Sequence, residues 1–308
     1  MRRLALVLLT AAAAAGADPA LLRLVMPEAR LVSGISIARM KKTPFGQFLL
    51  AEFSASQDQG FDSFVNASGF DPRYHLNEIL YASPGRADSG TRLVLVRGSF
   101  APPRIAELAR QAGAVIAPYQ GIDVITAPQA ASASPQTAPK AIAFLDQEIA
   151  VYGDAASVRA AIERRTRGAG PSLVIARKVR ALSPVADAWF VSTVPLAELI
   201  QRLPRRTPSS TLKAEALPSI RLASGGVTFG ASVKFSAEFV TRSPQDAASL
   251  AILLRLLVTQ LLASGPRPGA QPALPVEALQ LNAQGNLVRL SFAVPELQLE
   301  SLIQSAGK

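Results

Sequence analysis

The stretch Gly226–Leu262, GVTFGASVKFSAEFVTRSPQDAASLAILLRLLVTQLL, predicts a strand that runs directly into a helix. Its first part alternates apolar and polar residues with a period of two, which is typical of a strand with one buried side. The apolar set is Val233, Phe235, Ala237 and Phe239, and the polar set is Lys234, Ser236 and Glu238. We therefore expect one side of this strand to pack on a core and the other to meet solvent.

The helix that follows begins at a capping sequence. Ser243 is a favoured N-cap residue, Pro244 suits the first helical position, and Asp246 places an acidic side chain in the first turn. We expect this helix to reach about Leu262. Its main apolar face has helical spacing and consists of Ala247, Leu250, Leu254, Leu257, Val258 and Leu261.

Two further apolar residues of this helix, Ile252 and Leu256, fall on its opposite side. In one interpretation the other half of the chain or the segment 263–274 covers them. In the other they contact a protein partner or a membrane surface, because contiguous exposed apolar area usually marks an interaction site. Ile252 and Leu256 are therefore our candidate partner-binding residues, with interdomain packing as the alternative.

Residues 1–17 have the pattern of a secretory signal peptide. Two basic residues, Arg2 and Arg3, precede the apolar run Leu4–Ala14, and Ala15-Gly16-Ala17 supplies a small-x-small cleavage site. We expect a mature chain that begins at Asp18 and lies in the periplasm or outside the cell. The apolar run is short for a membrane span, although an uncleaved N-terminal anchor is an alternative.

The composition excludes several classes of protein. The 308 residues include no cysteine, so neither disulfides nor thiolate metal sites hold the fold together. Because 49% of the residues are hydrophobic, the chain can build sizeable cores instead. The formal net charge of +10 favours weak attraction to an anionic envelope surface, without identifying a ligand.

Strand-and-helix passages like the first one recur along the chain. By pattern, Thr91–Ala112 matches Ser232–Leu262, Ala141–Ile162 matches Ala278–Ile303, and Arg30–Phe53 matches Asp187–Leu203. In our reading, strands at Ile220–Ala223 and Val227–Thr241 flank a short break, and a helix begins at Pro195.

We infer a tandem duplication from these matches, with chance similarity in an alanine-rich chain as the alternative. The expected fold class is α+β, with two related units at 18–167 and 172–308 joined by a linker at 168–171. Strict alternation of strands and helices is absent, so each unit is expected to be a mainly antiparallel sheet with helices packed on one face.

The passages LVLVRGSFAPPRIAELARQAG (93–113) and AIAFLDQEIAVYGDAASVRAAIERR (141–165) resemble those of a broad family of exported bacterial proteins with a duplicated α+β unit. The similarity is one of pattern and extends over most of the mature chain. It implies an envelope location and a repeated unit. It supplies no catalytic residue.

Catalytic residue sets are scarce in this sequence. The one histidine, His75, would have to serve any Ser–His–acid system, with Asp71 or Asp62 orienting its ring. No G-x-S-x-G elbow is present to place a nucleophilic serine. We keep a hydrolase of envelope material that uses His75, Asp71 and Asp62 as the alternative function.

Other site chemistries are disfavoured as well. One histidine without cysteine does not make a common zinc site, and no cofactor motif is present. The glycines of 225–230 lack the Lys-Ser/Thr ending of a phosphate loop and precede a strand. Basic clusters lack interleaved aromatic residues, and Trp189 lies in an apolar strand, so we expect no nucleic-acid binding.

The sequence thus predicts an exported, non-enzymatic binding or interaction protein of the bacterial cell envelope. We expect no cofactor, no metal and no transmembrane span in the mature chain. Its partner would be a protein or an anionic envelope surface.

Overall fold

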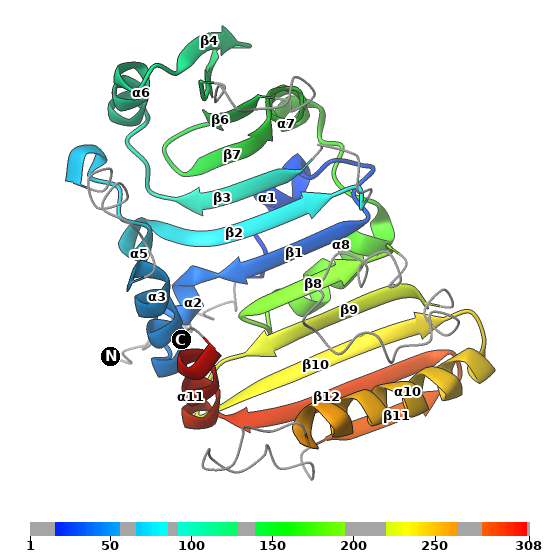
Figure 1. Cartoon of the computed structure of the whole chain (residues 1–308). Coiled ribbons are helices and arrows are strands. Elements are labelled where there is room, and N and C mark those ends of the chain that lie inside the picture. The colour runs from blue at the N-terminus through cyan, green and yellow to red at the C-terminus, as the bar shows by residue number, and fades with distance from the viewer. Residues whose placement is uncertain are drawn as a thin grey trace, which may run out of the picture.

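Strands from both halves of the chain hydrogen-bond into one antiparallel sheet in the computed structural model (Figure 1). The structure describes residues 16–55, 66–85, 92–128, 139–194, 220–263 and 279–306. Within them the sheet has 12 strands in the order β11-β12-β10-β9-β8-β1-β2-β3-β7-β6-β5-β4. The α+β class and the antiparallel pairing predicted from the sequence are confirmed.

The strands are β1 (Leu31–Ser36), β2 (Leu76–Ser83), β3 (Leu93–Gly98), β4 (Val115–Tyr119), β5 (Ile122–Thr126), β6 (Lys140–Phe144), β7 (Ile149–Asp154), β8 (Ala188–Ser192), β9 (Ile220–Thr228), β10 (Ser232–Thr241), β11 (Gln280–Gln284) and β12 (Leu287–Pro295). The helices are α1 (Pro19–Leu24), α2 (Ile37–Met40), α3 (Pro44–Ala55), α5 (Pro72–His75), α6 (Pro102–Gln111), α7 (Ala155–Arg167), α8 (Leu173–Leu182), α10 (Pro244–Ala263) and α11 (Glu296–Ala306).

The first strand of each half joins the two halves at the centre of the sheet. β1 and β8 pair antiparallel, from Leu31 opposite Ser192 to Ile35 opposite Ala188. Outward from β1 lie β2, β3, β7 and β6, and outward from β8 lie β9, β10, β12 and β11. The expectation of one sheet per unit is therefore corrected to a single sheet. Pairing of β1 with β8 satisfies backbone groups that would otherwise form an exposed sheet edge.

One side of the sheet, which we call the core face, carries Val32, Leu80, Leu95 and Val151, all fully buried. Three helices cover it: α1, α7 and α8 contribute buried leucine, valine and isoleucine side chains to the same cluster. This cluster also contains Trp189 and Val191 of β8. The main core therefore extends across the linker expected at 168–171.

The opposite side of the sheet, which we call the groove face, is covered at one end by α10. Ala247 and Leu250 of this helix pack on Ala223, Phe239 and Val288 in a second cluster. In Figure 1, α10 lies in front of β11 and β12, whereas α1 and α8 lie behind the sheet. Helices therefore flank both faces, which corrects the expectation that they lie on one face only.

The sequence of β10 explains why α10 packs on the groove face and not on the core face. Lys234, Ser236 and Glu238 alternate with the phenylalanines of β10, and the strand register turns these polar residues toward the core face. A helix with an apolar side can therefore bury it only against the other face of β10, where the apolar residues stand. The alternation predicted from the sequence is confirmed, but the side on which the helix packs was not predictable from it.

Local capping follows the sequence. Ser243 Oγ accepts the Asp246 backbone N–H at 3.1 Å at the start of α10, and Asp154 Oδ1 accepts that of Ser157 at 2.9 Å at the start of α7. Gly168 ends α7 in the left-handed region at φ +69°. These signals depend only on residues a few positions apart, which is why the sequence predicts them.

One local expectation was wrong, two elements were missed, and two further expectations are not tested. The break expected between strands near residues 224–226 is absent, because β9 runs continuously through Gly225 and Gly226. Helix α8 and strand β4 were not predicted. The expected leader up to residue 15 and the helix expected at Pro195 lie outside the described residues. None of the described helices is both long and apolar enough to cross a membrane.

Candidate binding groove on the sheet

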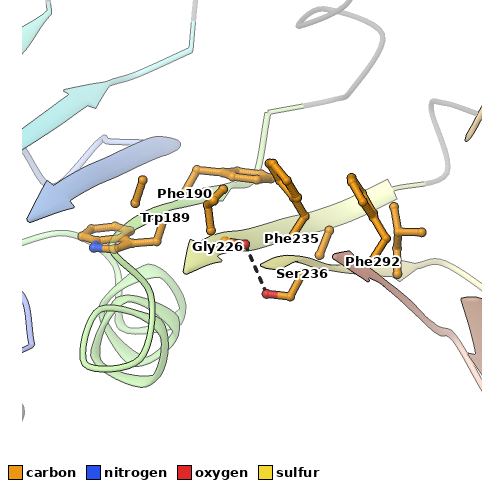
Figure 2. Close-up of a pocket in the computed structure, with 10 residues that line it drawn as sticks. Trp189, Phe190, Gly226, Phe235, Ser236 and Phe292 are labelled. Atoms are coloured by element: carbon orange, nitrogen blue, oxygen red, sulfur yellow. Dashed lines mark hydrogen bonds between the residues drawn. The ribbon is translucent and has the colours of Figure 1, made fainter. Parts of the chain in front are cut away.

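An apolar groove of about 330 Å³ lies on the groove face where β8, β9, β10 and β12 run side by side (Figure 2). It is lined by Ala188, Trp189, Phe190, Gly226, Val227, Phe235, Ser236, Ala237, Leu290 and Phe292. Most of these residues are apolar, and none has a titratable side chain. The groove can therefore desolvate an apolar group but cannot itself supply an acid, a base or a charge.

Three phenylalanines form the wall of the groove. Phe190 of β8, Phe235 of β10 and Phe292 of β12 stand on the same side of the strands (Figure 2), as their register requires. The Phe235 and Phe292 rings are stacked, with centroids 4.7 Å apart. Directly opposed residues of antiparallel strands bring their side chains together, so the ring pair follows from the pairing of β10 with β12.

A glycine of β9, Gly225, lets the Phe190 ring lie close to the backbone of the neighbouring strand. A Cβ atom on Gly225 would lie 2.8 Å from Cε1 of Phe190 and 2.6 Å from the Ser236 carbonyl oxygen. Any larger residue would therefore displace the Phe190 ring or the backbone of β10. This close approach accounts for glycine in the interior of β9, where the sequence suggested a strand break.

Trp189 and Ser236 line the groove from the other side of the sheet. In Figure 2 their side chains point away from the three phenylalanine rings, and Ser236 Oγ donates to the Gly226 carbonyl oxygen at 3.3 Å. Trp189 is 5% exposed and packs in the main core, as its apolar sequence context suggested. The only tryptophan of the chain therefore lies directly beneath the groove.

Charged residues of the same strands point to the core face instead. Glu238 binds Lys178 of α8 and accepts a hydrogen bond from Arg289 Nε at 3.0 Å. The hydrogen bond from Lys178, more than any other contact, lowers the pKa of Glu238. Lys178, Glu238 and Arg289 are thus paired on the far side of the sheet from the groove.

The predicted partner-binding residues lie apart from this groove. Ile252 and Leu256 are 73% and 59% exposed on α10, on the side away from Ala247 and Leu250. Among the described residues, neither lines the groove. The sequence does not single out the groove residues, because the alternation of β10 predicts an ordinary core position for Phe235. Only the order of strands β8 to β12 shows that α10 leaves part of the groove face uncovered.

The residues of the hydrolase hypothesis have other partners. Asp71 caps α5 and binds Arg73, whose Nε lies 2.9 Å from Asp71 Oδ1. These hydrogen bonds from Arg73 are the main reason why the pKa of Asp71 is lowered. His75 Nδ1 faces the backbone N–H of Asp71 at 2.8 Å, and its ring stacks on Phe70. Asp62 lies outside the described residues.

No metal site is evident in the part of the chain that the structure describes, where no group of three potential ligands occurs. Among the described residues, neither His75 nor Asp71 lines the groove, the cavity beside α1 or the two cavities near β5. What the geometry brings together in the groove is apolar surface rather than reactive groups.

Comparison with known proteins identifies the fold only. No family model matches the chain, and no curated protein matches it in sequence. The solved structure of crystal form I of TP0453 is similar, with a TM-score of 0.53 and 10% identity, over 92% of this chain and 96% of that chain. Crystal form IV of TP0453 gives a TM-score of 0.55 and 10% identity, over 94% and 97% of the two chains.

Proposed function

We propose that this protein is an exported, non-enzymatic binding protein of the bacterial cell envelope, and that the groove of Phe190, Phe235 and Phe292 receives an apolar group of its partner. The observation that carries the proposal is a concave apolar surface, free of titratable side chains, on strands whose charged residues Lys234, Glu238 and Arg289 point the other way. Such pockets are typical of ligand sites in which desolvation supplies the affinity.

The size of the groove suits part of a ligand. At about 330 Å³ it lies at the lower end of the range of small-molecule pockets, so it would hold one large side chain or a short hydrocarbon segment. Full burial of one such group is worth about 1.5–3 kcal/mol. Tight binding therefore requires further contacts, for which the exposed Ile252 and Leu256 of α10 are the candidates.

The proposal of export rests on the N-terminal sequence. Arg2 and Arg3, the apolar run that follows, and Ala15-Gly16-Ala17 together have the order of a cleavable leader. The absence of cysteine and the net charge of +10 are compatible with an envelope location. The positive charge would add a weak, salt-sensitive attraction to anionic envelope surfaces.

The proposal of a duplicated unit is supported by the order of the strands. Both halves place a helix before their first strand, α1 before β1 and α8 before β8. From the central pair outward, β2, β3, β7 and β6 then correspond to β9, β10, β12 and β11. In this scheme β4 and β5 are an addition to the first unit.

The groove is tested with an uncharged fluorescent probe, N-phenyl-1-naphthylamine. We expect the probe to bind the mature protein and to change the emission of Trp189, which lies beneath the groove. Phe235→Ala removes one wall and should weaken binding about tenfold, the factor that corresponds to about 1.4 kcal/mol. Titrations of the wild-type and variant proteins measure this ratio.

The matched control is Phe144→Ala, which changes the same type of residue on the same face of the sheet, but at β6. Far-ultraviolet circular dichroism confirms that both variants fold. Equal loss of binding in the two variants, or no binding by the folded wild-type protein, would contradict the groove. Recovery of the whole chain from the cytoplasm with Met1 still attached would contradict export.

A further inference from the structure

A second cavity, of about 440 Å³, lies beside the start of α1 and has four charged side chains among its lining residues. It is lined by Gly16, Ala17, Asp18, Pro19, Ser36, Ala38, Arg39, Asn77, Glu78, Arg97, Ser183 and Trp189. The residues around the expected cleavage site thus form one wall, and β1, β2, β3 and the end of α8 form the others.

Glu78 is a carboxylate in direct contact with the expected mature N-terminus. The backbone N–H of Asp18 donates to Glu78 Oε2 at 3.1 Å. Burial of this side chain raises the pKa of Glu78 to about 7, although Arg39 acts in the opposite direction. As long as the Asp18 nitrogen is part of a neutral peptide bond, it offers no positive charge to offset the negative charge of an ionised Glu78.

The arginines around Glu78 are bound to other carboxylates. Arg39 Nε lies 3.1 Å from Asp187 Oδ1, and its guanidinium also donates to the carbonyl oxygens of Ser183 and Pro184. Arg97 pairs with Asp18 and with Glu148. In the described part of the chain, no ion pair joins Glu78 to either arginine.

Removal of the leader would change the chemistry of this contact. Hydrolysis of the Ala17–Asp18 peptide bond adds water across the amide, so that Ala17 leaves with a carboxylate and Asp18 keeps an amine. An α-amino group has an ordinary pKa of about 7.7–8.0 and gains a proton near neutral pH. The neutral donor to Glu78 would then become a cation.

We propose that the Ala17–Asp18 bond is a processing site whose new N-terminus is held as an ammonium by Glu78. The inference rests on the export part of the proposed function and adds a role for this cavity. The new ammonium and an ionised Glu78 carry opposite charges. Together they give the cavity the same net charge as the neutral amide and protonated Glu78 of the uncleaved chain. A charged hydrogen bond of this kind is stronger than the amide contact that it replaces.

Asp18 is held in place by contacts that do not involve residues 16 and 17. Its Oδ1 accepts the Ala20 backbone N–H at 2.7 Å, and its carbonyl oxygen accepts that of Leu22 at 3.0 Å. Leu21 and Leu24 of the same helix are buried in the main core. Loss of Gly16 and Ala17 removes a hydrogen bond from Ala17 to Ser183 but leaves these anchors of Asp18 intact.

The test compares three otherwise identical proteins that begin with free Asp18, with free Gly16, or with N-acetylated Asp18. Each is made with and without Glu78→Gln. We expect Glu78→Gln to lower Tm by at least about 3 °C in the free-Asp18 protein. The change should be much smaller in the other two, because neither presents an ammonium to Glu78. Glu107→Gln, an exposed acid on α6, is the control and should leave all three Tm values unchanged.

The dependence on pH gives a second readout. In the Gly16 protein the raised pKa of Glu78 means that the folded state holds a proton that the unfolded state releases above about pH 4.5. Its stability should therefore fall as the pH rises from 4.5 to 7. In the free-Asp18 protein the ammonium should lower the pKa of Glu78 and reduce this fall. Asp18, Arg39 and Arg97 also line the cavity, and Asp187 and Glu148 pair with the two arginines, but all five are present in both proteins.

Three results would overturn the proposal. The first is an exported protein whose mass shows a start at a residue other than Asp18. The second is an equal effect of Glu78→Gln on Tm in all three proteins. The third is the same fall in stability with pH in the Gly16 and Asp18 proteins. Probe binding at the groove is measured separately, so the groove proposal can survive failure here. A cytoplasmic chain that retains Met1 would contradict both this processing site and the export on which it rests.

Discussion

Gly34 shows how closely the two halves of the sheet are fitted together at the level of single residues. It lies on β1 opposite Trp189 of β8, and a Cβ atom at this position would be 2.4 Å from Cζ2 of the indole. The indole therefore occupies the space of a missing side chain. The contact joins residues 155 positions apart at the central strand pair. A change in this contact therefore indicates a change in how the two halves of the sheet pack together.

Gly34→Ala should destabilise the protein by about 1–3 kcal/mol, because the added methyl group would displace a buried indole. Urea unfolding measures the loss, and the emission maximum of Trp189 should shift as the ring moves. Ser33→Ala is the control, since Ser33 stands on the opposite face of β1 and is half-buried. A Gly34→Ala protein as stable as the control would show that the indole repacks without cost.

At the scale of elements, α10 presents two apolar sides with different environments. Leu250 is fully buried against the sheet, whereas Ile252 and Leu256 are exposed. Ile252→Glu combined with Leu256→Glu should therefore change the free energy of unfolding by no more than about 0.5 kcal/mol per site. If these residues bind a partner, the double variant should lose association in light scattering and pull-down experiments.

Leu250→Glu provides the contrast on the same helix, because it buries a carboxylate in an apolar cluster and should prevent stable folding. Thermal melts of the two variants separate the sides of α10. Unfolding of the Ile252/Leu256 variant would mean that these side chains are packed against the rest of the chain. An unchanged solution mass and pull-down profile would contradict their role in partner binding.

Elements with strong local signals were predicted, and elements without them were not. Before α6 and α7 stand short apolar strands, and the strand before α10 alternates apolar and polar residues. Each of these helices begins with a proline or a capping acid or serine. Helix α8 begins with a serine that forms no capping hydrogen bond, directly after the expected linker. Its burial against the first half of the chain is a tertiary contact, which local pattern does not encode.

At the scale of the whole molecule, one core serves both halves. Ile175 and Val179 of α8 and Val191 of β8 lie in the same cluster as Leu80 and Leu95 of β2 and β3. The sheet is continuous through the β1–β8 pair. We therefore expect the two halves to depend on each other for stability, even if they arose from one duplicated unit.

The mature protein should accordingly unfold in a single cooperative transition. Circular dichroism and Trp189 fluorescence should give coincident urea curves, and the calorimetric and van't Hoff enthalpies should agree. Separate chains of 18–171 and 172–308 should each fail to fold, because each would expose half of the shared core and a strand edge. Two resolved transitions, or a stable isolated half, would show that the units are independent.

The sequence by itself determined the α+β class, most strands and helices with their caps, the polar and apolar sides of β10, and the absence of disulfides. These properties depend on residues near one another in the chain or on composition alone. Only the tertiary structure decided that β1 and β8 make one sheet, that helices flank both faces, and that three phenylalanines from separate strands line a groove beneath which Trp189 lies. Each of these depends on which strands become neighbours, and hydrogen bonding between strands can join any two edges of suitable length. The local sequence pattern does not specify which strand edges pair.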